Sequence, residues 1–236
     1  MLEPILNSFE ILDLLAFAFF LIAWIGFTIV ADYSSFHSRT VTAKINLVRK
    51  LWMQQMLQRD FRMVDTQIMG NLGNGIAFFA STSILIVGGL SAALASSNKV
   101  VILLRDVPFA GNLSVLAFEL KVLLLIVIFI YAFIKFSWSF RLSNYCSILI
   151  GAAEIAKPDD PELAQKADMP ASISGLAGMH FNRGLRSYFF ALAVLPWFIH
   201  VYAFLLSTAC VLIMQYRREF ASKSKGYLEA YLKSQN

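Results

Sequence analysis

The stretch LAFELKVLLLIVIFIYAFIKFSW, residues 116–138, decides the fold class of this protein. At about 1.5 Å per residue, a helix of this length crosses the hydrocarbon layer of a bilayer. Its charged residues, Glu119, Lys121 and Lys135, lie near its two ends. The helical pattern then continues without proline to about residue 155. We therefore expect one helix that leaves the membrane as a continuous rod.

Three further segments are apolar enough to cross a membrane. Residues 14–30 and 76–95 contain no charged side chain. Residues 188–214 contain no Asp, Glu, Lys or Arg and one histidine. The whole chain of 236 residues is 58% hydrophobic and 15% charged, which is too apolar for a soluble core of this size. The sequence predicts an all-α integral membrane protein, a single membrane domain over residues 1–236, with about four transmembrane helices.

The polar segment between the first two spans also has helical periodicity. Two apolar stripes run along it and point in different directions. The first consists of Val41, Ile45, Val48, Trp52 and Met56, and the second of Leu57, Phe61, Val64, Ile68 and Leu72. This pattern predicts a long cytoplasmic amphipathic helix over residues 39–72, broken near Met56. We expect it to lie on the membrane or to pack on another subunit.

The remaining segments read as packing surfaces and connections. Residues 76–95 hold small side chains four apart, such as Gly88 and Ala92, which allow close helix packing in lipid. Residues 98–113 form a short connection with a turn at Pro108 and Gly111. Residues 157–171, KPDDPELAQKADMPA, contain three prolines and six charges and predict a surface loop.

Basic residues indicate the orientation in the membrane. No lysine or arginine precedes the first span, whereas residues 32–74 contain six, which places the N-terminus outside and this segment in the cytoplasm. Four spans then leave a tail with five basic residues outside, against the same rule. A half-span over residues 139–155 would bring the tail inside, but this segment carries Arg141 and is short, so we retain four spans.

Charge and motifs exclude several function classes. The chain has a net charge of +5, and its basic residues cluster beside the apolar spans. Anionic lipid headgroups are therefore the expected partner rather than nucleic acid. Cys146 and Cys210 read as small hydrophobic residues, and no spacing suggests a metal or cofactor site. The sequence has no GxSxG, HExxH or P-loop motif, so we do not expect an enzyme.

His200 is the sharpest candidate for a proton or ion site. It lies near the middle of the fourth expected span, one turn after Pro196, which leaves the carbonyl of Leu192 without its helical donor. The alternative is a neutral histidine that bonds to a neighbouring helix. Glu119 either lines a pore mouth or lies at the interface, as the lysines of its helix do.

A second group of candidates lies in the cytoplasmic segment. Arg59, Arg62 and Asp65 form the motif RDFRMVD, in which Arg62 and Asp65 are spaced to pair on one helical face. They read either as a solvated surface or as a cytoplasmic charged collar whose charges pair between subunits.

Several stretches together resemble a known family. They include RKLWMQQMLQRDFRMVDTQIMGNLGNGIAFFASTSILI, residues 49–86, and NYCSILIGAA, residues 144–153, as well as HFNRGLRSYFFALAVLPWFIH, residues 180–200. The chain resembles an uncharacterised multi-pass membrane family catalogued as domain of unknown function number 599, over roughly residues 30–230. The resemblance implies a bacterial inner-membrane protein with about four helices, and it carries over no activity or site.

These observations favour a homo-oligomeric channel or transporter-like protein. Four spans form a thin bundle. The amphipathic helix over residues 39–72 has more apolar surface than the rest of one chain could cover, so another subunit could cover it. The basic cytoplasmic side would favour anions. The alternative is a non-catalytic accessory or structural subunit that packs on other membrane subunits of a larger complex. A membrane enzyme ranks third, for want of a catalytic set.

Overall fold

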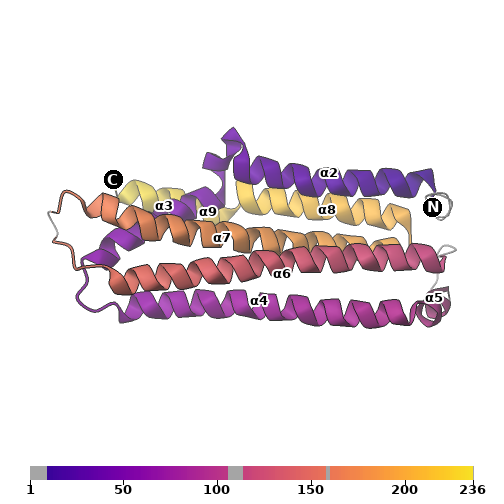
Figure 1. Ribbon diagram of the computed structural model, residues 1–236. Helices are drawn as coiled ribbons and strands as arrows, with labels where there is room; N and C mark the ends of the chain where they lie inside the picture. Colours follow the sequence, from indigo (N-terminus) through magenta and orange to yellow (C-terminus); the bar gives the residue numbers. More distant parts are fainter. Residues whose placement is uncertain (1–9, 106–113, 158–159, 236) are drawn as a thin grey trace.

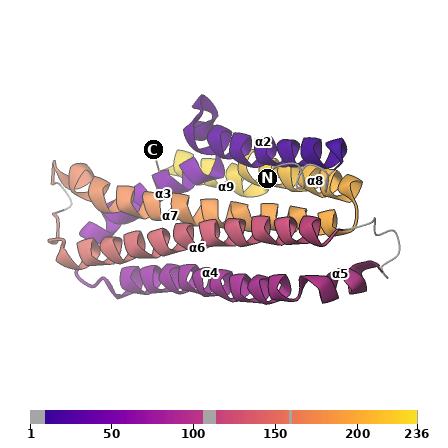
Figure 2. The same cartoon turned by 45° about the vertical axis from the view of Figure 1, so that its right-hand side comes forward.

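The computed structural model describes residues 10–105, 114–157 and 160–235. Every regular element in these ranges is a helix. In chain order they are α2 (Ile11–Tyr33), the 3-10 turn η1 (Ser35–Arg39), α3 (Val41–Leu57), α4 (Met63–Ala95), α5 (Ser97–Arg105), α6 (Val115–Ala152), α7 (Leu163–Val194), η2 (Leu195–Phe198), α8 (Val201–Phe220) and α9 (Lys223–Ser234). Figures 1 and 2 show α2, α4, α6, α7 and α8 side by side in one elongated bundle.

Three helices are long and apolar enough to cross a membrane, namely α2, α4 and α6. They contain the expected spans 14–30, 76–95 and 116–138. With 33 and 38 residues, α4 and α6 measure about 50 and 57 Å, against about 30 Å of hydrocarbon. Both therefore extend well beyond α2, and the rod predicted to follow residue 138 is confirmed as the second half of α6 (Figure 1).

The fourth expected span is not one helix. Residues 188–214 are divided by η2, and α8 runs back along the bundle beside α7 and α2 (Figure 1). Pro196 has no N–H to continue the helical hydrogen bonds, so α7 ends and the chain reverses. Across this hairpin Ser207 Oγ donates to the carbonyl of Ala193 at 2.7 Å. The reversal returns the C-terminal tail to the end of the bundle that holds α3.

The helix expected over residues 39–72 is also divided. The break predicted near Met56 is confirmed, because α3 ends at Leu57 and the next helix begins at Met63. Residues 63–72, however, are the first turns of α4 and continue directly into the second span. Helix α3 packs against α7 and α9 of its own chain, with Lys44 Nζ 3.7 Å from Glu229 Oε1.

The surface loop expected over residues 157–171 is shorter than its composition suggests. Helix α7 begins at Leu163, since residues 163–169 are mostly strong helix formers, and Pro170 lies inside the helix. Ala167 and Ala171 are buried against α3 and α6. The short connection after α4 begins as helix α5, and the turn expected at Pro108 and Gly111 lies outside the described residues.

Aromatic side chains fill the interior where α2, α6, α7 and α8 meet. The rings of Phe20 and Phe190 lie 5.8 Å apart between centroids, and those of Trp197 and Phe204 stack at 4.5 Å. All four side chains are buried. Such packing leaves the centre of the bundle solid and holds the α7–α8 hairpin against α2.

Replacing Gly184 with alanine tests this packing. The new methyl group of Gly184→Ala would lie 2.5 Å from the buried Phe136 ring, so we expect it to lower the free energy of unfolding by about 1–3 kcal/mol. Gly151→Ala in α6 is the control, because its added Cβ has no neighbour within 4 Å. The measurement is unfolding of the purified protein in mixed micelles. Equal stability of both variants would contradict the close approach of α6 and α7.

Candidate functional site

A buried ion-pair cluster joins the end of α2 to the second half of α7. Asp32 Oδ2 accepts a hydrogen bond from Arg183 Nε at 2.7 Å, and Asp32 Oδ1 lies 3.2 Å from Arg186 Nη2. None of the three side chains is more than 10% exposed. Arg183 and Arg186 are one helical turn apart, which turns both toward the single carboxylate. We call these three residues the Asp32 cluster.

The Asp32 cluster carries a net positive charge, because two guanidinium groups share one carboxylate. The Arg183 guanidinium also lies over the ring of Tyr33 and that of Arg186 over Phe27, each 5.1 Å from the ring centroid. These contacts add cation–π attraction. In a buried ion pair desolvation offsets much of the attraction, yet loss of one partner leaves a charge stranded. Both arginines therefore depend on Asp32.

A polar cavity of about 580 Å³ opens beside the Asp32 cluster. Helix α3 and the first half of α7 form most of its walls. Asp32, His37, Asn46, Lys50 and Asp168 are among its lining residues. Lys50 Nζ lies 2.7 Å from Asp168 Oδ1, an ion pair between the two helices. Apolar side chains such as Leu176 and Met179 also line the cavity, and its size suits a small solute.

The predicted collar residues lie together, but they do not pair as expected. Asp65 is fully buried and accepts hydrogen bonds from Arg59 Nη1 at 2.7 Å and from Trp52 Nε1 at 2.6 Å. Arg62 instead donates to the carbonyl groups at the C-terminal end of α6, at 2.5–3.0 Å. A cation at a helix C-terminus is favourable. These bonds lie within one chain, where they tie the start of α4 to α3 and α6.

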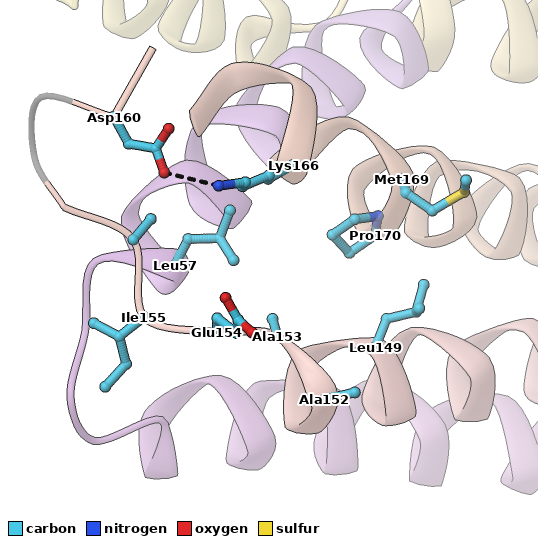
Figure 3. A pocket seen from close by; sticks show the side chains of 11 residues that line it. Leu57, Leu149, Ala152, Ala153, Glu154, Ile155, Asp160, Lys166, Met169 and Pro170 are labelled. Atoms are coloured by element: carbon cyan, nitrogen blue, oxygen red, sulfur yellow. Dashed lines mark hydrogen bonds and ion pairs between the residues drawn. The ribbon is translucent and has the colours of Figure 1, made fainter. Parts of the chain in front are cut away.

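A smaller cavity of about 340 Å³ lies at the same end of the bundle, between the ends of α3 and α6 and the start of α7 (Figure 3). Its walls are mostly apolar, with Leu57, Leu149 and Pro170 facing it. Lys166 Nζ donates to Asp160 Oδ2 at 3.0 Å. This bond holds the pKa of the Asp160 carboxyl below its usual value. Lys166 is exposed and Asp160 is partly exposed, so the pair contributes little to stability.

The other sequence candidates lie at the opposite end of the bundle. His200 is exposed at the N-cap of α8, where its Nδ1 accepts a hydrogen bond from the Tyr202 N–H at 3.3 Å. The carbonyl of Leu192, expected to be free because of Pro196, accepts from the N–H of Leu195. The histidine thus caps a helix at a turn instead of lying inside a continuous one. Its role in proton or ion movement stays a prediction.

Two charged residues of α6 also lie at this end. Glu119 accepts a hydrogen bond from Ser97 Oγ at 2.7 Å and thereby holds α5 against α6. Lys121, expected to extend toward the interface, is only 6% exposed. Its Nζ donates to the carbonyl of Trp197 at 2.8 Å, while Trp197 Nε1 donates to Asp13 Oδ1 at 2.6 Å. Hydrogen bonding to the hairpin thus replaces the expected snorkelling.

The Asp32 cluster was missed by sequence reasoning, which treated its members only as charges that flank spans. The available signal was an acidic residue at the end of one span together with the R-x-x-R spacing of Arg183 and Arg186 before another. Among the residues that the structure describes, no group of three or more His, Cys, Asp or Glu side chains could hold a metal ion. Cys146 is a buried thiol, as expected, whereas Cys210 is exposed.

Removing the charge of Asp32 tests the cluster. Asp32→Asn should lower the free energy of unfolding by about 3 kcal/mol, because two buried guanidinium groups lose their counter-charge. Asp160→Asn, at an exposed ion pair, is the control and should leave stability unchanged. The measurement is the unfolding transition in detergent. Adding Arg186→Met to Asp32→Asn should restore part of the loss, and failure of this rescue would contradict the assignment.

No curated protein and no solved structure matches the chain. One family model matches residues 15–224, from the first apolar helix to the start of α9, and its description reads "Protein of unknown function, DUF599". Since this match covers most of the chain, the protein belongs to the DUF599 family.

Proposed function

We propose that the protein is a homo-oligomeric, transporter-like protein of the bacterial inner membrane whose solute is a small anion. The observation that carries the proposal is the net positive Asp32 cluster, buried beside a polar cavity of about 580 Å³. Ionisable groups at the membrane level of a helical protein are costly to bury and commonly belong to solute or ion pathways. Within the cavity wall Asp168 is paired with Lys50, and Asp32 is paired with two arginines, so the local charge is positive and favours an anionic solute.

The proposal includes five membrane crossings rather than four. Helix α8 has 20 residues, which is about 30 Å of helix, and it runs antiparallel to the second half of α7. Five crossings place the tail on the same side as α3, with which α9 packs. The five basic residues of the tail then join those of residues 32–74, so most basic residues lie inside, and the outer connection keeps only Lys99 and Arg105.

An oligomer is supported by the surface of α4. This helix packs mainly on α6 and leaves an exposed face with both polar and small side chains, namely Asn71, Asn74, Ser81, Gly88 and Ala92. Polar groups that face lipid are unfavourable, and small residues permit close helix contact. A second copy of α4 would cover this face. Because aromatic rings fill the interior of each chain, a pathway would run between copies or open by movement of the α7–α8 hairpin.

Site-directed labelling tests the five-crossing topology. In a background with Cys146→Ser and Cys210→Ser, we expect Asn98→Cys in α5 to react with a membrane-impermeant maleimide in intact cells. Ser234→Cys in α9 should react only after permeabilisation. Both positions are exposed, so access depends on the side of the membrane. Labelling of both cysteines in intact cells would restore the four-crossing arrangement and refute the fifth.

Reconstitution tests transport. Purified protein in liposomes should give flux of phosphate, sulfate or chloride above empty vesicles. Arg186→Lys should reduce this flux roughly tenfold, because a lysine cannot form both of the bonds that Arg186 makes to Asp32. Arg218→Lys, the same change at an exposed position of α8, is the control. The predicted role of His200 is lost if wild type and His200→Ala both show flux that is constant from pH 5 to 8.

The alternative, an accessory subunit, predicts a different result. The exposed face of α4 would then be covered by another polypeptide that co-purifies with the chain, and the pure protein would give no flux. A particle that contains only this chain and carries anions supports the transport proposal. A mixed particle with silent liposomes overturns it.

A further inference from the structure

A third cavity, of about 150 Å³, lies where four helices meet on the α3 side of the Asp32 cluster. Its polar lining residues come one or two from each helix: Arg49 from α3, Asn71 from α4, Ser139 and Ser143 from α6, and Ser174 from α7. It is too small for a nucleotide or a sugar, but it has room for a compact ion. We call it the Arg49 cavity.

Arg49 brings an uncompensated charge to this cavity. Its Nη1 donates to Asn46 Oδ1 at 2.7 Å, and no carboxylate of the described residues forms an ion pair with it. The guanidinium lies against Gly178, where a side chain would collide with it. Burial lowers the pKa of the Arg49 guanidinium, yet an arginine stays charged at neutral pH. A half-buried cation of this kind requires an anionic partner.

Two serine hydroxyls face the same cavity without a partner. Ser143 and Ser174 are each only 4% exposed, and within the described part of the chain neither hydroxyl forms a hydrogen bond. Neither hydroxyl oxygen is among the fully enclosed polar atoms that lack a partner, so both are open to the cavity and can donate to a group bound in it. Ser139 differs, because its hydroxyl donates to the carbonyl of Ala177 at 2.7 Å.

We propose that the Arg49 cavity binds a small oxyanion of the phosphate or sulfate type. The planar guanidinium of Arg49 can donate two parallel bonds to two oxygens of such an anion. The hydroxyls of Ser143 and Ser174 donate to its other oxygens. A halide would leave most of these directed donors unused. The two cavities are neighbours along the same pair of helices, α3 and α7. Asn46 and Gly175 line the larger polar cavity, and Arg49 and Gly178, three residues further along each helix, line the Arg49 cavity.

The inference deepens the proposed transport function and rests on it for the biological role of the site. Binding is measured separately from flux. The probe is labelled inorganic phosphate or sulfate, applied to purified protein in detergent at constant ionic strength. We expect saturable binding by wild type. Arg49→Gln should weaken it roughly 10- to 100-fold, since the charged hydrogen bonds are lost.

Two further variants separate a built site from general attraction. Lys44→Gln removes the same charge five residues earlier on α3, where Lys44 lies 3.7 Å from Glu229 and lines neither cavity, and should leave binding unchanged. Gly178→Ala keeps every charge but pushes the guanidinium of Arg49 away, and should weaken binding as Arg49→Gln does. Without oxyanion, Arg49→Gln should melt at the same temperature as wild type or higher, because the variant removes a half-buried charge that has no carboxylate partner among the described residues. Phosphate should raise the melting temperature of wild type but not that of Arg49→Gln.

The outcomes are distinct. No saturable binding by wild type, or equal loss in Lys44→Gln and Arg49→Gln, overturns the site. Binding without flux supports the site and overturns transport, whereas flux without binding does the reverse. Competition by phosphatidylglycerol in nanodiscs would assign the bound oxyanion group to a lipid headgroup, and absence of competition would assign it to a free ion; both results support an oxyanion site.

Discussion

The carboxylate of Asp32, held between Arg183 and Arg186, is the interaction on which the rest of the structure depends. It fixes the depth of α2 against α7, and it marks the level at which α2 ends while α4, α6 and α7 continue. Below this level the bundle is a membrane core of aromatic rings. Beyond it the same helices surround three cavities, each with at least one charged side chain in its wall, so the ion-pair cluster lies between the aromatic core and these cavities.

Much of the fold could be predicted, because its signals are local. Apolar length located α2, the membrane part of α4, and α6, and changing apolar faces located the break before α4. The errors came from tertiary effects. Pro196 was expected to kink a span, but packing of α8 on α2 and α7 turns the kink into a hairpin. The charges of residues 163–169 suggested a loop, whereas burial of Ala167 keeps them helical.

The candidate site was less predictable, since its residues are far apart in the chain. Arg183 meets Asp32 across 151 positions and Arg62 reaches the carbonyl of Ile150 across 88. No periodicity within one segment carries such information. The sequence did indicate that basic residues gather at one end and that anions would suit them. Only the packing of α3 on α7 shows that Arg49 is half-buried against Gly178 with no carboxylate partner among the described residues.

The same ion-pair cluster has a consequence for biogenesis. Asp32 emerges from the ribosome about 150 residues before its two partners, so α2 enters the bilayer with its acidic end unneutralised at the surface. With the five proposed crossings, the α7–α8 hairpin inserts last and carries two arginines, whose insertion is costly until they meet the carboxylate of Asp32. Assembly in the membrane would then be ordered, with α2 kept at the insertion site until the hairpin is complete.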